Sequence, residues 1–77
     1  MSDVESGTHA VAVTINGTAI HLSPPTIAAT MVHIGVPMET RHVAVAVNDA
    51  VISRAAWAST TLVTGDCIEI ITAVAGG

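Results

Sequence analysis

Residues 11–22 read VAVTINGTAIHL, and this stretch decides the fold. Asn16-Gly17 at its centre is typical of a two-residue type I′ hairpin, in which both turn residues need a positive φ. The turn sets three facing pairs: Val11 with Leu22, Val13 with Ile20, and Ile15 with Thr18. The large apolar side chains then share one face, and the other face receives Ala12, Thr14, Ala19 and His21. The stretch predicts an antiparallel hairpin with one covered face and one face in water.

A short helix is expected after the hairpin. Pro24 precedes another proline and is pushed out of the α region, so Thr26 can cap the first helical turn. Ile27, Met31 and Ile34 recur at helical spacing, and the glycine that follows them ends the pattern. A helix of roughly two to three turns is too short to be stable alone. We therefore expect it to lie on the apolar face of the hairpin.

The next part of the chain is expected to add two strands and a turn. Residues 41–47 end in VAVAV, whose valines alternate with small alanines. Residues 48–50 have the composition of a turn, and residues 51–52 are long enough only for a short strand. Ser53 is then placed to cap a brief helical turn over residues 54–57.

A last strand is expected over residues 67–72, after a turn at residues 64–66. Its alternation puts Ile68, Ile70 and Thr72 on one face and Cys67, Glu69 and Ile71 on the other. The order strand, strand, helix, strand, short strand, strand predicts an α+β fold of the β-grasp (ubiquitin-like) kind. We expect a mixed sheet of about four to five strands with one main helix packed on one face.

The length of the chain, 77 residues, is enough for one small domain. The expected division is a disordered N-terminal extension over residues 1–10, the β-grasp domain over residues 11–72, and a flexible C-terminal tail over residues 73–77. A domain of this size leaves no room for the walls of a deep catalytic cavity. We therefore expect a protein that is not itself an enzyme.

Composition argues against nucleic acids and membranes as partners. Six acidic residues stand against two arginines, Arg41 and Arg54, so the chain lacks the positive charge that phosphate contacts need. Residues 6–38 carry no charged side chain, but Asn16-Gly17 and Pro24-Pro25 interrupt every window of about 20 residues that could span a membrane.

Cysteine and histidine give little sign of a reactive or metal-binding site. Cys67 is the single cysteine, and its charged neighbours in sequence, Asp66 and Glu69, are acids that disfavour a thiolate. The histidines have no spacing typical of metal ligands, so no metal site is expected; they are His9, His21, His33 and His42. The single cysteine cannot form an internal disulfide, which fits a reducing compartment. The acidic N-terminal residues are unlike a signal peptide, so we expect a cytoplasmic protein.

The last five residues, Ala73-Val74-Ala75-Gly76-Gly77, follow the apolar strand directly. Glycine lacks a Cβ, so a backbone ending in Gly76-Gly77 can enter a narrow tunnel. The α-carboxylate of Gly77 is then a group that a partner can activate, after which a sulfur or amine nucleophile replaces the activating group. The alternative is that these two glycines are a frayed end with no chemical role.

Residues 45–77 resemble the second half of the ThiS family of thiamine-pathway sulfur carriers. The similarity consists of an Asn after the third strand, an R-x-x-W turn, a Gly-Asp turn, an I-E-I strand and a final AVAGG. These stand here as Asn48, Arg54 and Trp57, Gly65 and Asp66, Ile68 to Ile70, and Ala73 to Gly77. The resemblance implies a β-grasp protein without catalytic activity.

The same resemblance implies a reaction sequence and a set of partners. A ThiF-like adenylyltransferase would use ATP to form an acyl-adenylate on Gly77, and no cofactor would be bound permanently. Sulfur that a cysteine desulfurase takes from cysteine would convert the adenylate to a thiocarboxylate. A ThiG-like thiazole synthase would then take that sulfur for the thiazole ring. Residues 73–76 would bind the partners, and the free carrier would be a monomer.

Other functions stay open on the sequence. The small subunit of molybdopterin synthase has a proline-rich approach to its Gly-Gly end that residues 72–75 lack, whereas a carrier for cysteine synthesis shares AVAGG. The tail alone therefore does not separate that second carrier from ThiS, and the R-x-x-W turn has to decide. A ubiquitin-like modifier or a plain interaction module is a further alternative. The chain has no lysine, and its apolar tail lacks the basic residues of conjugating modifiers.

Four further residues carry expectations of their own. Trp57 is the one aromatic residue and is expected to cover the core, although a partly exposed ring could also anchor a partner. Arg54 is expected to bond to carbonyls or to an acid such as Asp49 or Asp66. Ile71 and Val74 are candidates for a partner-binding groove, and the alternative for Ile71 is that it caps the end of the sheet.

Overall fold

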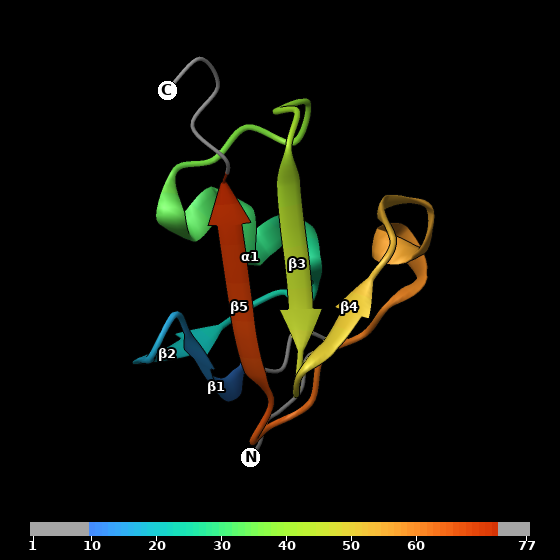
Figure 1. The fold of residues 1–77 in the computed structure, drawn as a ribbon. Coiled ribbons are helices and arrows are strands. Elements are labelled where there is room, and N and C mark those ends of the chain that lie inside the picture. Colours follow the sequence, from blue (N-terminus) through green and yellow to red (C-terminus); the bar gives the residue numbers. More distant parts are fainter. Residues whose placement is uncertain (1–9, 73–77) are drawn as a thin grey trace.

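The structure, a computed structural model, describes residues 10–72 and has a single mixed sheet with one α-helix behind it (Figure 1). The sheet has five strands in the order β2-β1-β5-β3-β4. Along the chain the elements are β1 (Val11–Ile15), β2 (Thr18–Leu22), α1 (Ile27–Ile34), β3 (Val43–Val47), β4 (Ala50–Ile52), the 3₁₀ helix η1 (Arg54–Ser59) and β5 (Cys67–Thr72). The expected β-grasp architecture is confirmed. Residues 1–9 of the expected extension and residues 73–77 of the expected tail lie outside the described residues.

The hairpin has the register that its turn predicts. Asn16 and Gly17 have φ values of 50° and 86°, as a type I′ turn requires. The facing pairs run from Ile15 with Thr18 to Val11 with Leu22. Val13, Ile15 and Leu22 are buried beneath the helix side of the sheet, whereas Ala12 and His21 are exposed on the other side.

Helix α1 begins and ends at the residues that the sequence predicts. The Thr26 hydroxyl accepts a hydrogen bond of 3.1 Å from the amide of Ala29, which satisfies one free donor of the first turn. Gly35 has a φ of 80°, and the amide of Val36 reaches back to the Met31 carbonyl at 2.9 Å. A positive φ at the helix end is costly for any residue with a Cβ, which explains a glycine there.

The middle of the chain differs from the expectation in three details. Strand β3 begins at Val43 instead of residue 41, because His42 has a φ of 60° and cannot continue an extended strand. Ser53 precedes η1, but its side chain makes no capping hydrogen bond. The helical turn is also longer than expected and reaches Ser59. Hydroxyls of Ser59 and Thr60 donate to the Ala56 carbonyl at its end, at 3.1 and 2.7 Å.

The core lies between the sheet and α1 and is closed at one side by η1. Its buried apolar residues are Val13, Ile15, Leu22, Ile27, Met31, Val45, Trp57, Leu62, Ile68 and Ile70. Thr30 is the buried polar residue among those described, and its hydroxyl donates to the Ile27 carbonyl at 2.6 Å, so burial leaves no unpaired donor. None of the helices within residues 10–72 has the length and apolar character needed to cross a membrane.

Candidate functional site

Strand β5 runs through the middle of the sheet and leads toward the C-terminus (Figure 1). It pairs in parallel with β1 at Cys67 and Ile68, and antiparallel with β3 as far as Thr72, which faces Val43. These neighbours end at different points along β5, because β1 pairs only as far as Ile68 and β3 pairs as far as Thr72. Strand β1 turns back after Ile15, and His42 before β3 has a left-handed backbone. The sheet therefore stops supporting β5 at Thr72, directly before the Ala73–Gly77 segment.

The carboxamide of Asn16 extends the support that β1 gives to β5. The Asn16 amide donates to the Ile68 carbonyl at 2.9 Å, which is the last main-chain bond between these strands. Beyond it, Asn16 Oδ1 accepts from the Ile70 amide at 2.9 Å and Asn16 Nδ2 donates to the Ile70 carbonyl at 3.2 Å. One side chain thus replaces the next residue of a strand, and it fixes β5 two residues before its end.

A second asparagine fixes the beginning of β5. The Asn48 amide donates to the Cys67 carbonyl at 2.8 Å, and Asn48 Oδ1 accepts from the Cys67 amide at 2.9 Å. Asn48 Nδ2 also donates to Asp66 Oδ1 at 2.9 Å, while Asp66 Oδ2 accepts from the Val63 amide at 2.9 Å. The Asn48 turn and the Gly-Asp turn, both part of the ThiS-like pattern, therefore act together on one strand.

Arg54 and Trp57 of the R-x-x-W turn are in contact. The guanidinium carbon of Arg54 lies 4.4 Å from the centre of the Trp57 ring, and its two terminal nitrogens donate to the carbonyls of Met38 and Thr40 at 2.7 and 2.6 Å. Arg54 was expected to bond either to carbonyls or to an acid, and in the structure it bonds to carbonyls. The Trp57 side chain is only 4% exposed and donates from Nε1 to the Ile52 carbonyl at 2.9 Å. Its ring belongs to the core.

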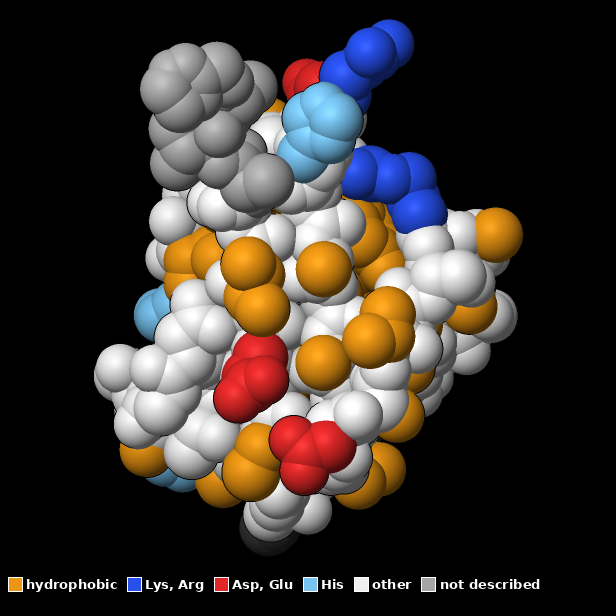
Figure 2. All heavy atoms as spheres, in the orientation of Figure 1, with side chains coloured by type: hydrophobic (Ala, Val, Ile, Leu, Met, Phe, Trp, Pro, Cys, Tyr) orange, Lys and Arg blue, Asp and Glu red, His pale blue; other side chains and the backbone are white. Residues whose placement is uncertain are grey.

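The face of the sheet opposite α1, here called the outer face, is exposed over β5, β3 and β4. Ile71 is 61% exposed and stands beside Ala44, and Val51 is 76% exposed and stands beside Ala46. Figure 2 looks onto this face, where hydrophobic side chains gather in the middle and acidic ones lie below them. Within residues 10–72 no helix or strand covers this surface.

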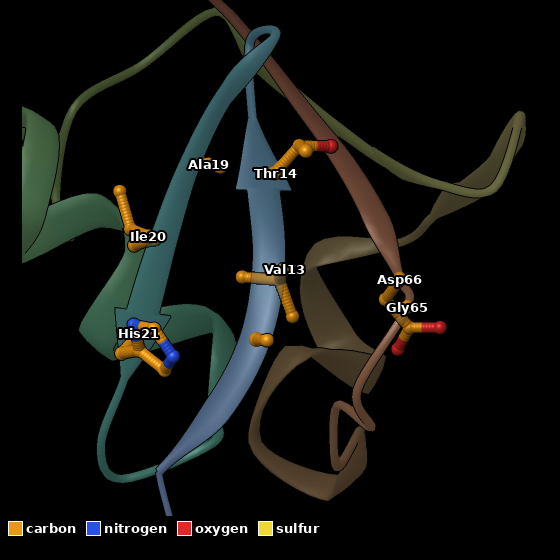
Figure 3. A pocket seen from close by; sticks show the side chains of 8 residues that line it. Val13, Thr14, Ala19, Ile20, His21, Gly65 and Asp66 are labelled. Atoms are coloured by element: carbon orange, nitrogen blue, oxygen red, sulfur yellow. The ribbon is translucent and has the colours of Figure 1, made fainter.

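The outer face continues as a shallow hollow of about 240 Å³ over the hairpin (Figure 3). Ala12 and Ala19 are small, so the surface sinks between Thr14, His21 and the Gly65-Asp66 turn. The turn is tied to β1, because the Gly65 amide donates to the Ala12 carbonyl at 2.8 Å. The outer face thus offers small and apolar side chains for contact, and no deep cavity.

The described part of the chain contains no cluster of three or more His, Cys, Asp or Glu side chains placed to hold a metal ion. Cys67 is exposed on the outer face. The residues expected to carry the chemistry, Gly77 and the Ala73–Gly76 segment, lie outside the described residues. The last described residue before that segment is Thr72, at the end of β5 and directly after Ile71.

The model of the ThiS family matches residues 9–77. The chain belongs to the ThiS family. Members of this family are small sulfur carriers, generally without catalytic activity, and membership supports a sulfur carrier in thiamine biosynthesis. The match covers the hairpin and helix as well as the second half of the chain that first suggested it.

Among solved structures, the chain is similar to a thiamine biosynthesis protein (ThiS) from Geobacter metallireducens, with 24% sequence identity and a TM-score of 0.67. The similarity covers 87% of this chain and 100% of that chain, and it supports the β-grasp fold. No curated protein matches the chain significantly.

Sequence reasoning missed two residues that shape the site, Asn16 and Asn48. Asn16 was expected only as a turn residue, and Asn48 only as a turn residue and a family feature. Their side-chain bonds join positions 54 and 19 residues apart in the sequence, Asn16 to Ile70 and Asn48 to Cys67. An asparagine with a positive φ that ends a strand next to a longer strand is the signal that could have indicated this role.

Proposed function

We propose that this ThiS-family chain carries sulfur on its C-terminal carboxylate for the thiazole ring of thiamine. The observation that carries the proposal is that the family match extends through Gly76-Gly77. Glycine at both positions lets the main chain enter a tunnel too narrow for side chains. The chain itself then supplies a reactive carboxylate, and partner enzymes supply the catalysis.

The proposed reaction has two steps on Gly77. A ThiF-like adenylyltransferase lets a carboxylate oxygen attack the α-phosphorus of ATP, which releases pyrophosphate and leaves an acyl-adenylate. In the second step, a persulfide formed from cysteine by a desulfurase displaces AMP, and a thiol then cleaves the S–S bond of the resulting acyl disulfide, which releases the thiocarboxylate and leaves a disulfide. ATP is a substrate of the partner, and the carrier keeps no cofactor of its own.

A ThiG-like thiazole synthase is the proposed acceptor. It would take the sulfur atom from the thiocarboxylate and return the carboxylate form of Gly77. We place the whole cycle in the cytoplasm and propose that the free carrier is a monomer. The segment Ala73–Gly76 enters the partner, and Ile71 on the outer face contacts the partner surface beside the tunnel.

The burial of Trp57 favours an indirect role for this residue. Its side chain is 4% exposed, so it can offer little surface to a partner. Arg54, stacked on the ring, holds the carbonyls of Met38 and Thr40, and the chain then continues through residues 41–42 into Val43 opposite Thr72. On this proposal Trp57 supports the place where the tail leaves the sheet.

Adenylation by the cognate adenylyltransferase tests the proposal, with ATP–pyrophosphate exchange as the measurement. We expect exchange with the full chain and none after deletion of Gly77. One residue added after Gly77 should also abolish exchange, because it displaces the reactive carbonyl by about 3.5 Å. A misplacement of about 1 Å can already cost a hundredfold in rate. Exchange that persists with the deleted chain would contradict the proposal.

A further inference from the structure

The main-chain groups of β5 point alternately toward β3 and toward the hairpin. On the β3 side, the carbonyl of Cys67 accepts from Asn48. On the hairpin side, the carbonyl of Ile68 accepts from the Asn16 amide, and both groups of Ile70 bond to the Asn16 side chain. Main-chain direction in a strand repeats every second residue. The N–H and C=O of Thr72 therefore point toward the hairpin side, as those of Ile68 and Ile70 do.

On that side no strand of the described chain runs beside Thr72. The β1 register ends with Ile15 opposite Ile68, and the chain then turns back at Asn16-Gly17. The Asn16 side chain bonds to the main-chain groups of Ile70, and within residues 10–72 it makes no hydrogen bond to Thr72. Thr72 is exposed. Among residues 10–72, the end of β5 is thus paired on its β3 edge and has no partner strand on its hairpin edge.

From this open edge we infer that the adenylyltransferase adds an extended main-chain segment alongside Thr72 on the hairpin side of β5. The inference rests on the proposed function and deepens it. Unpaired strand edges are templates for another chain, and strand addition is a common way to hold an extended peptide. The chain beyond Thr72 has only small or aliphatic side chains, so main-chain hydrogen bonds are the specific contacts that it offers.

The added segment would start from a fixed point. Asn16 occupies the edge up to Ile70, so a partner strand can pair first at Thr72 and cannot slide along β5 toward Ile68. Register in strand addition is otherwise poorly determined. The asparagine therefore sets the distance along the chain between the partner strand and the Gly77 carboxylate. This distance matters because a misplacement of about 1 Å in an active site can cost a hundredfold in rate.

Thr72→Pro is the variant that tests the inference, because proline lacks the N–H that the partner strand would bond to. The fold should tolerate it, since this N–H faces away from β3. Thr72→Val is the matched control, as it keeps the N–H and the β-branched shape. The contrast variant Ile71→Pro removes an N–H that points toward Ala44 in β3 and should instead destabilise the fold.

The measurement is kcat/KM for carrier in ATP–pyrophosphate exchange, with thermal unfolding of each variant as the check on the fold. We expect Thr72→Pro to lower kcat/KM about tenfold, the effect of one lost interfacial hydrogen bond, with an unfolding temperature close to that of the wild type. Thr72→Val should stay within about twofold of the wild type. Equal values for Thr72→Pro and Thr72→Val would overturn the inference.

Amide hydrogen exchange gives a second readout that needs no substitution. In the free carrier the Thr72 amide should exchange much faster than the Ile71 amide, and the enzyme should slow Thr72 at least about tenfold. Slow exchange of Thr72 in the free chain, whether from its own terminus or from a second copy, would overturn the inference. Wild-type carrier that supports no ATP–pyrophosphate exchange would instead overturn the proposed function, and the inference with it.

Discussion

Arg54 lies over Trp57, with its guanidinium carbon 4.4 Å from the centre of the ring. The same guanidinium donates to the carbonyls of Met38 and Thr40, which belong to the loop that leads into β3. Strand β3 starts at Val43, opposite Thr72. The R-x-x-W pair therefore links the core to the part of the sheet from which the C-terminal segment departs.

Arg54→Lys should lower the free energy of unfolding by about 1 kcal/mol, because an ammonium group cannot bond to two carbonyls in a planar fork while it stacks on an indole. Urea unfolding followed by Trp57 fluorescence measures this. Arg41→Lys is the matched control: Arg41 is exposed, and the change should stay within about 0.5 kcal/mol. Equal effects of the two substitutions would contradict the role given to Arg54.

Trp57→Ala should lower the free energy of unfolding by about 3–5 kcal/mol, since it empties a large volume in a small core. Trp57→Phe should cost less, because it keeps an aromatic ring and loses the hydrogen bond to the Ile52 carbonyl. Thermal unfolding measures both. An unchanged unfolding temperature for Trp57→Ala would mean that the ring is not part of the core.

Asn16→Gly isolates the contribution of the Asn16 carboxamide. Glycine accepts the φ of 50° at this turn position, so the hairpin keeps its conformation while the two side-chain bonds to Ile70 are lost. We expect a loss of about 1–2 kcal/mol in stability and faster hydrogen exchange at the Ile70 amide. An Ile70 amide that stays as protected as before would show that another group satisfies it.

Ile71→Asp should weaken binding of the adenylyltransferase by about 1–3 kcal/mol, because it places a charge in the apolar part of the outer face. Isothermal titration calorimetry measures this. Val32→Asp is the control: Val32 is 74% exposed on α1, on the opposite side of the sheet. An equal fall for both variants would mean that the added negative charge, whatever its position, weakens binding, and a fall for Val32→Asp alone would place the partner on the helix side.

Much of the fold could be predicted because its signals are local. The Asn-Gly turn determined the hairpin register, and Thr26 and Gly35 determined the ends of α1 through bonds within a few residues. The faces of β5 followed from alternation alone: Ile68 and Ile70 are buried, and Ile71 is exposed.

The features that the sequence did not predict depend on contacts between distant segments. Leu62 is 1% exposed although it lies in no helix or strand, and its amide donates to the carbonyl of Pro25, which is distant in the sequence. His42 gave no sign of its positive φ, which starts β3 two residues later than expected. For Arg54, the sequence left carbonyls and acids open as partners, and the folded loop provides the carbonyls of Met38 and Thr40.

The central claim, that sulfur is carried on Gly77, is tested most directly by the intact mass of the carrier after incubation with adenylyltransferase, ATP and a sulfur source. The account predicts an increase equal to the mass difference between sulfur and oxygen. The increase should persist in Cys67→Ser, because no side chain carries the sulfur, and disappear when thiazole synthase and its other substrates are added. An unchanged mass of the wild-type chain, or an increase that is lost in a folded Cys67→Ser variant, would contradict the account.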